Sequence, residues 1–116
     1  MIRRARDEQT LHRSLVEHLR WRAPLDCWFC HIPNGGARTA TEGAIFKSLG
    51  VRAGAPDLLI VSAGRPLFLE LKAPGRKLSA AQAKCHAALK RAGAIVETVD
   101  DIDDALGLLA KLGVLR

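Results

Sequence analysis

Apolar residues recur along the chain at two spacings, one typical of helices and one typical of strands. Leu11, Leu15 and Leu19 lie four positions apart with Val16 beside them, which predicts a helix over about residues 7–21 with one apolar face. Short apolar runs bounded by turn-forming residues predict strands. They cover residues 27–32, 57–62, 67–72 and 94–99. The turn Ala63-Gly64-Arg65-Pro66 separates the two middle runs, so we expect them to form a hairpin.

Helix start signals predict three further helices. Thr39 with Glu42, and Ser79 with Gln82, have the spacing of capping boxes. Asp100 or Asp101 can cap a last helix. The predicted helices run over about residues 40–49, 80–92 and 102–112, each followed by a glycine. The order α-β-α-β-β-α-β-α predicts an α/β fold with a mixed central sheet flanked by helices, and the length of 116 residues predicts one domain spanning residues 1–116.

The charge balance adds a class of partner. Eighteen Lys and Arg against 12 Asp and Glu give a net charge of +6 and a pI near 9.8, which indicates a polyanionic partner. Aromatic residues make up only 4%, which argues against a surface that depends on base stacking. The last 20 residues hold five of the acids, and we interpret these as helix-capping charge turned away from the partner.

The chain shows no sign of export. Residues 1–8 are charged and lead into no long apolar stretch, so no signal peptide is evident. No run approaches the roughly 20 apolar residues of a membrane span. Three cysteines are an odd number, which makes a disulfide framework improbable. We expect an intracellular, cytoplasmic protein that does not associate with a membrane.

A competing motif involves the cysteines. The run Cys27-Trp28-Phe29-Cys30-His31 matches the C-x-x-C-H pattern of c-type haem attachment, and Cys85 and His86 could complete a zinc site with Cys27 and Cys30. Positions three apart on a strand point to opposite faces, and only one C-x-x-C pair is present. We therefore expect no haem and free, buried cysteines.

The sharpest chemical feature is an Asp followed, 13 residues later, by Glu-x-Lys. Asp57 begins one strand of the predicted hairpin, and Glu70 and Lys72 end the other. Residues two apart on a strand share a face, so Glu70 and Lys72 project together and the hairpin brings Asp57 near them. Two adjacent carboxylates favour a divalent cation such as Mg²⁺, and a Lys beside them can orient or deprotonate a water or neutralise charge on a phosphate.

The same residues also have an ordinary interpretation, an Asp at a strand start and a Glu–Lys pair at an edge. Two features favour the site. Gly54 and Pro56 impose an unusual backbone just before Asp57, and Glu70 interrupts an otherwise apolar strand, where a charge is costly.

At this point the sequence resembles the VRR-NUC family of the PD-(D/E)xK nuclease superfamily, over about residues 8–109. The resemblance implies a restriction-endonuclease-like αβββαβ core and a Mg²⁺- or Mn²⁺-dependent DNA endonuclease. Short stand-alone members are associated with homodimers that cut branched DNA, such as four-way (Holliday) junctions. The segments that carry it are Glu8-x-x-Leu11, Ile32-Pro33-Asn34-Gly35-Gly36, Leu49-Gly50-Val51-Arg52-Ala53-Gly54-Ala55-Pro56-Asp57, Glu70-Leu71-Lys72, Leu78-Ser79-x-x-Gln82 and Ala92-Gly93-Ala94.

The resemblance also implies site residues. The family pattern expects a first-helix Glu in the metal site, and at 100° per residue Glu8 shares the face of Leu11 whereas Glu17 is opposite. The metal ligands would be Glu8, Asp57, Glu70 and the Leu71 carbonyl, with Lys72 acting on the water. Gln82 could act beside Lys72 as well as cap its helix. His12 stands where the family often has Gln, which leaves its role open.

Two sets of residues are candidates for contacts with DNA. The turn formed by Asn34, Gly35, Gly36 and Arg38 offers backbone amides and a basic end to a phosphate, or is only a tight loop. Arg52, Arg76 and Lys77 flank the proposed site in the sequence and are either phosphate contacts or plain surface charges. An alternative function is a non-catalytic basic DNA-binding module of the same fold.

Overall fold

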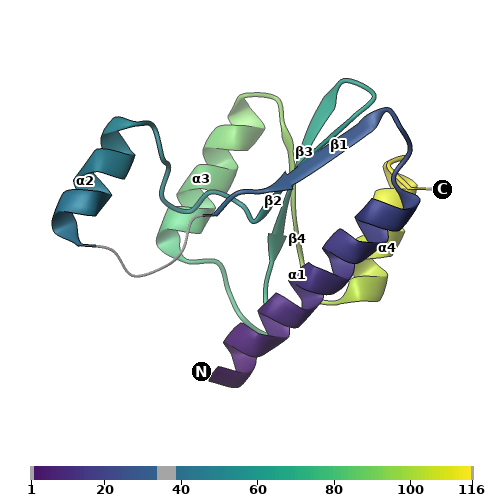
Figure 1. Ribbon diagram of the computed structural model, residues 1–116, viewed down its shortest axis with the longest axis horizontal. Helices are drawn as coiled ribbons and strands as arrows, with labels where there is room; N and C mark the ends of the chain where they lie inside the picture. The colour runs from purple at the N-terminus through teal and green to yellow at the C-terminus, as the bar shows by residue number, and fades with distance from the viewer. Residues whose placement is uncertain (1, 34–38, 116) are drawn as a thin grey trace.

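The helices and strands follow the predicted order (Figure 1). The computed structural model describes residues 2–33 and 39–115, with side chains in the first helix described from residue 7 onward. Within these residues the elements are α1 (Ile2–Arg22), β1 (Cys27–His31), α2 (Ala40–Ser48), β2 (Leu58–Ser62), β3 (Arg65–Leu71), α3 (Ala80–Arg91), β4 (Ile95–Val99) and α4 (Ile102–Lys111).

The strands form one mixed sheet in the order β1-β2-β3-β4. β1 and β2, and β2 and β3, pair antiparallel, whereas β3 and β4 pair parallel. The parallel pair is connected through α3, as a crossover connection requires. Together α1, β1, β2, β3, α3 and β4 make the predicted αβββαβ core, and α2 and α4 are added to it. The predicted α/β fold with a mixed sheet is therefore confirmed.

The hairpin between β2 and β3 is tighter than predicted. Its loop is Ala63-Gly64, and both residues have positive φ, 51° and 77°, as in the two-residue turns whose twist matches a hairpin. The prediction of a turn up to Pro66 is wrong, because β3 begins at Arg65. Pro66 is tolerated there because pairing with β4 begins only at Leu67, so its missing N–H lies outside that ladder.

Side chains alternate between the two faces of β3. Leu67, Leu69 and Leu71 are buried in the main core on the face covered by α1 and α4, which pack together across the sheet (Figure 1). Leu15 of α1 and Leu109 of α4 are fully buried there. Glu70 points to the opposite face, which α3 covers. The predicted apolar face of α1 is thus confirmed, and it fixes the helix against the sheet.

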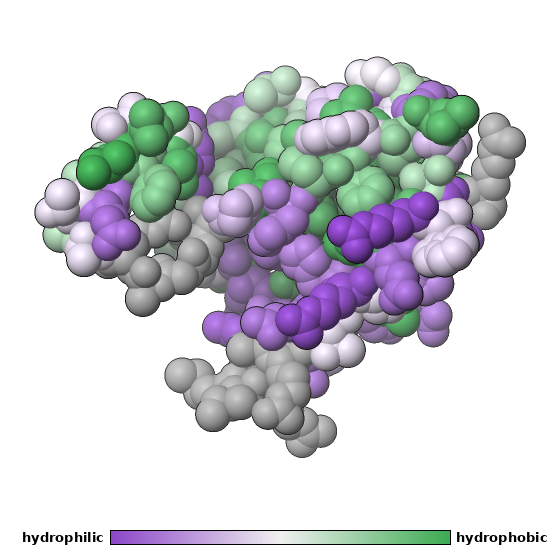
Figure 2. All heavy atoms as spheres, viewed as in Figure 1, coloured by the Kyte–Doolittle hydropathy of each residue, from purple (hydrophilic) through white to green (hydrophobic). Residues whose placement is uncertain are grey.

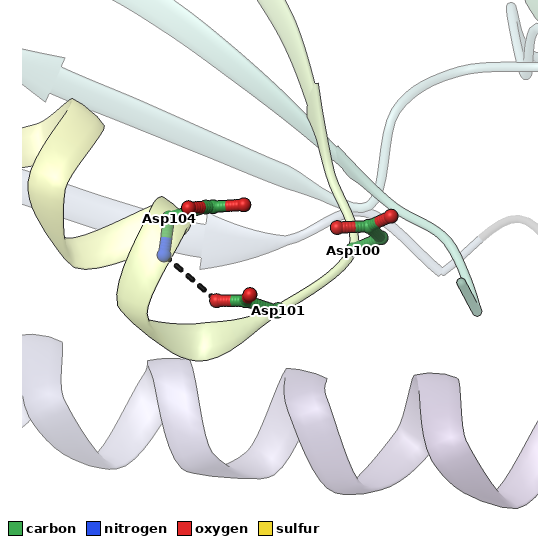
Figure 3. Close-up of side chains that lie close together, drawn as sticks. All are labelled: Asp100, Asp101 and Asp104. Atoms are coloured by element: carbon green, nitrogen blue, oxygen red, sulfur yellow. Dashed lines mark hydrogen bonds between the residues drawn. The ribbon is translucent and has the colours of Figure 1, made fainter. Parts of the chain in front are cut away.

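The helix caps predicted from the sequence can be compared with the structure. Both predicted capping boxes form, at Thr39 and at Ser79. The N-cap of α4 is Asp101, whose side chain accepts a 2.8 Å hydrogen bond from the Asp104 N–H (Figure 3). Asp100 lies beside them (Figure 3), and their carboxylate oxygens are within 4.8 Å of one another. Helix capping accounts for the Asp101 carboxylate of this acidic cluster.

Two helices depart from expectation. α1 begins at Ile2, earlier than the predicted residue 7. The prediction missed this first turn because its residues are mostly charged and lack the apolar spacing on which the prediction depended. α2 has no buried residue and stands apart from the sheet (Figure 1). None of the helices among the described residues has the length and apolar character needed to cross a membrane.

Candidate active site

A cleft of about 600 Å³ opens where α1, β1, the end of β3 and the start of α3 meet. It collects most of the residues proposed from the sequence for the metal and the catalytic step. Glu8, Asp57, Glu70, Leu71 and Gln82 all line it. These residues come from four separate segments of the chain, so the fold, rather than local sequence, assembles the cleft.

Asp57 and Glu70 lie next to each other across the hairpin. Leu58 pairs with Leu69, so Asp57, one position earlier, lies opposite Glu70 on the same face of the sheet. The Leu71 N–H donates a 2.7 Å hydrogen bond to Asp57 Oδ2. This hydrogen bond fixes the Asp57 carboxylate against the end of β3, as the hairpin prediction required.

Glu70 is a strongly perturbed acid. It is 2% exposed, and burial, a hydrogen bond with the Asp57 side chain and the charge of Asp57 raise the pKa of Glu70 to about 9. The charge of Lys72 lowers this pKa, whereas that of Glu8 raises it. The fold therefore holds Glu70 protonated at neutral pH unless a further positive charge enters the cleft.

His86 of α3 is a partner of Glu70 that the sequence analysis did not identify. Its Nε2 lies 3.0 Å from Glu70 Oε1, and both side chains are buried. Burial and the charges of Lys90 and Lys72 lower the pKa of His86. The contact is therefore a hydrogen bond between neutral groups at neutral pH. His86 lies one helical turn after Gln82, and this four-residue spacing was the available signal.

Glu8 lies at the rim of the cleft. It is half-buried while Glu17 is exposed, as helix geometry predicted. Its Oε1 accepts a 3.0 Å hydrogen bond from the Ala73 N–H and forms a 3.3 Å ion pair with Arg76 Nη1. Among the described residues, the oxygens of Glu8, Asp57 and Glu70 do not all lie within 4.8 Å of one another. Arg76, predicted as a phosphate contact, is thus engaged with Glu8.

Gln82 lines the cleft, whereas Lys72 is not among its lining residues and acts on Glu70 through its charge. Lys72 follows the last residue of β3 and is 7% exposed, and its backbone N–H donates a 3.0 Å hydrogen bond to the Val99 carbonyl. Its charge acts on both Glu70 and His86. Gln82 accepts a 2.9 Å hydrogen bond from the Ser79 N–H and also lines the cleft. The cap and the place beside the site, both predicted for Gln82, are therefore compatible.

Gly54 joins the loop before β2 to the start of α3. Its φ is +77°, and a Cβ at this position would lie 2.3 Å from the Ala81 carbonyl oxygen and 2.6 Å from the Gln82 nitrogen. Only glycine permits this conformation together with this approach. Gly54 thus sets the distance between the Asp57 loop and the helix that carries Gln82 and His86.

Two further histidines line the cleft. The rings of His12 and His31 meet edge to face with centroids 4.5 Å apart. His31 Nδ1 lies 2.8 Å from the Asp57 carbonyl oxygen, and because a carbonyl only accepts, Nδ1 carries the proton. Burial, followed by the charge of His31, lowers the pKa of His12. His12 therefore packs as a neutral ring beside the carboxylates.

The remaining predicted DNA contacts have varied outcomes. Asn34, Gly35, Gly36 and Arg38 lie outside the described residues. Arg52 and Lys77 are exposed, and Arg52 lines a second groove beside the cleft.

The residues of the alternative zinc site are not gathered into one place. Cys27 and Cys30 are half-buried on β1, and Cys85 is buried on α3. Across residues 2–33 and 39–115, no cysteine belongs to a group of three metal-binding side chains. His86 instead contacts Glu70. All three cysteines are free, as expected, but the expectation that they are buried is correct only for Cys85.

Fold and cleft together define a mixed α/β protein in which a buried Glu70 lies beside a half-buried Asp57 where the two central strands β2 and β3 pair. The model of the VRR-NUC domain matches residues 6–100. The chain therefore belongs to the VRR-NUC family, a family of nucleases, which supports a DNA nuclease and confirms the resemblance seen in the sequence.

Solved structures agree on the fold. A protein described as a VRR_NUC domain protein is 21% identical, with a TM-score of 0.75 over 94% of this chain and 90% of the other. A second, described as a VRR_NUC domain, is 23% identical, with a TM-score of 0.63 over 90% of this chain and 95% of the other. No curated protein matches the sequence.

Proposed function

We propose that the protein is a Mg²⁺- or Mn²⁺-dependent DNA endonuclease that hydrolyses phosphodiester bonds in the cleft. The observation that carries the proposal is the Asp57–Glu70 pair: burial, a hydrogen bond with Asp57 and the repulsion that the Asp57 charge would exert on a second carboxylate raise the pKa of Glu70 to about 9. A divalent cation relieves that repulsion. All the proposed ligands are oxygens, which Mg²⁺ and Mn²⁺ prefer, so the residues present fit such an ion.

In this proposal Asp57 and Glu70 hold the metal, with the Leu71 carbonyl and Glu8 as further ligands. Mg²⁺ usually keeps several waters and needs only one or two carboxylates, so Glu8 can act through a water while it remains paired with Arg76. When bound, the metal supplies charge stabilisation and a more acidic water. Lys72 orients or deprotonates the attacking water, and Gln82 helps to position it.

Basic residues around the cleft would bind the DNA backbone. Arg52 and Lys77 are exposed and free to approach phosphates, and Arg76 reaches the rim beside Glu8. The turn with Asn34, Gly35, Gly36 and Arg38 is proposed as a further phosphate contact. Such contacts position DNA but do not read its sequence, so they fit cleavage directed by DNA structure, such as a branch.

Cutting both strands of a junction would use two copies of the chain, and we include a homodimer in the proposal. Trp21, Leu25 and Trp28, at the junction of α1 and β1, are 84%, 107% and 58% exposed. Large apolar side chains exposed in one region favour association. Light scattering of the purified protein measures the molar mass and tests the dimer separately from the activity.

The test of the function is a panel of DNAs incubated with the pure protein. Four-way junctions, flaps and linear duplexes are incubated with Mg²⁺, with Mn²⁺ and with EDTA. The proposal predicts nicks that depend on metal and favour branched DNA. Tight, salt-sensitive binding without products would instead identify a non-catalytic DNA-binding module.

A further inference from the structure

A second groove, with a volume of about 930 Å³, runs between α2 and α3. Its lining includes four cations: Lys47 from α2, Arg52 from the following loop, and Lys84 and Arg91 from α3. No acidic side chain is among the described residues that line it. A groove of one charge sign concentrates the opposite charge, so its electrostatics suit a polyanion.

The groove continues directly from the cleft. Gly54 and Ala81 line both hollows, and Gly54 packs against the Ala81 backbone at the boundary. A strand whose phosphate lies at Asp57 and Glu70 would pass across this boundary and run on between the four cations. The acids thus lie at one end of a path whose continuation, among the described residues, has only basic residues as its charged lining.

Apolar side chains are placed within this basic path. Phe46 and Val51 line the groove and are 39% and 38% exposed. Figure 2 shows apolar side chains gathered over α2, at the left of the view. A helix of nine residues without a buried side chain gains little stability by itself, so α2 is suited to being covered by a ligand.

We propose that the groove between α2 and α3 binds an unpaired DNA strand that leads away from the scissile phosphate. Duplex DNA offers mainly phosphates to a groove, whereas an unpaired strand also offers the faces of its bases. The four cations would bind its phosphates, and the Phe46 ring, the one aromatic side chain among the described lining residues, would stack with one base, so binding would depend on phosphate contacts more than on stacking. This assignment rests on the proposed nuclease function of the cleft and gives it a specificity: a junction between paired and unpaired DNA.

Charge also decides between the occupants. A second copy related by two-fold symmetry would present the same face and bring four cations against four, which is unfavourable. A nucleic acid strand neutralises all of them.

The test is binding in EDTA, where no cleavage is needed. Fluorescence anisotropy compares a forked duplex carrying two unpaired arms with a blunt duplex of the same paired sequence. Phe46→Ala and the double variant Lys84→Glu/Arg91→Glu are the test variants. Leu49→Ala, at the C-cap of α2, and Lys90→Glu on α3 are the controls, because both residues are exposed and lie outside the groove lining. Circular dichroism checks that each variant is folded.

We expect the wild type and both controls to prefer the fork. Phe46→Ala should bind the fork at least about fivefold more weakly, as for the loss of one stacked base. The double variant should also reduce the salt dependence of fork binding by about 0.7 for each phosphate that its side chains no longer neutralise. Both substitutions should weaken binding of the blunt duplex less than they weaken binding of the fork.

Three results would overturn the assignment. They are unchanged fork binding by both test variants, an equal loss for fork and blunt DNA, and a dimer that dissociates on Phe46→Ala, which would make the face a contact between copies. A protein that binds forks in this way and never cuts DNA would refute the nuclease function alone, so the two failures are distinguishable.

Discussion

Glu70 makes the stability of the metal-free protein depend on pH in an unusual direction. In the unfolded chain this carboxyl loses its proton near pH 4.5, whereas burial and Asp57 raise its pKa in the folded chain to about 9. Between these values the folded state holds one more proton than the unfolded state. Stability from this group is therefore fully present below pH 4.5 and decreases as the pH rises toward 9.

The expected size is measurable. Each pH unit between the two pKa values costs about 1.4 kcal/mol, so raising the pH from 5 to 7.5 removes about 3 kcal/mol of unfolding free energy. For a chain of this size that corresponds to a fall in Tm on the order of 10 °C. Glu70→Gln removes the titration and leaves a neutral side chain of similar shape.

The assay is thermal and urea unfolding in EDTA from pH 5 to pH 8, for the wild type, Glu70→Gln and Glu97→Gln. Glu97 is an exposed carboxylate on β4 and serves as the control. Groups that do not interact with residue 70 titrate equally in all three proteins, so the difference between variant and wild type isolates Glu70 together with the groups coupled to it, Asp57 and His86. Glu70→Gln should gain stability over the wild type with rising pH, and Glu97→Gln should not. A difference for Glu70→Gln that stays constant with pH would refute the reasoning.

Three more predictions concern the metal and the walls of the cleft. Binding of Mn²⁺ at pH 7 should release close to one proton per ion, because Glu70 must ionise. Calorimetry in two buffers of different ionisation enthalpy measures the number of protons released. Mn²⁺ binding without proton release would contradict the role of Glu70. His86→Ala should weaken Mn²⁺ binding about 10–100-fold by leaving Glu70 unsupported, and an unchanged dissociation constant by titration calorimetry would contradict this. Gly54→Ala should destabilise the protein by more than about 1 kcal/mol, because its Cβ would meet the Ala81 carbonyl oxygen at 2.3 Å. Gly43→Ala is the control: a Cβ at Gly43 would have no atom within 4 Å, so this variant should be neutral or stabilising in urea unfolding. Equal effects of the two substitutions would argue against the close packing at Gly54.

Much of the fold was predictable because its signals are local. The leucines of α1 and the capping boxes at Thr39 and Ser79 act within one element, and the structure contains each of them. The Ala63-Gly64 turn was missed in detail because Ala rarely adopts positive φ. Proline at 66 looked like a turn residue, and only the late start of pairing with β4 explains it.

The site was predictable only where a strand or helix period determined it. Alternation placed Glu70 and Lys72 on one face, and helix geometry turned Glu8 toward the cleft. Contacts between distant segments carried no such signal: Glu8 with Arg76, 68 residues apart, and Glu70 with His86 depend on how α1 and α3 dock. The exposure of α2 was equally hidden, because the capping box at Thr39 predicts where the helix begins but not whether it packs against the sheet.

The central claim is that the Asp57–Glu70 cleft cuts DNA with the help of Lys72. The most direct measurement is the rate of cleavage of a labelled four-way junction in Mn²⁺ by the wild type, Asp57→Ala and Lys72→Ala, with DNA binding measured in EDTA on the same preparations. The account predicts metal-dependent products from the wild type and none from either variant, with folding and binding largely retained. Cleavage at the wild-type rate by either variant would contradict it.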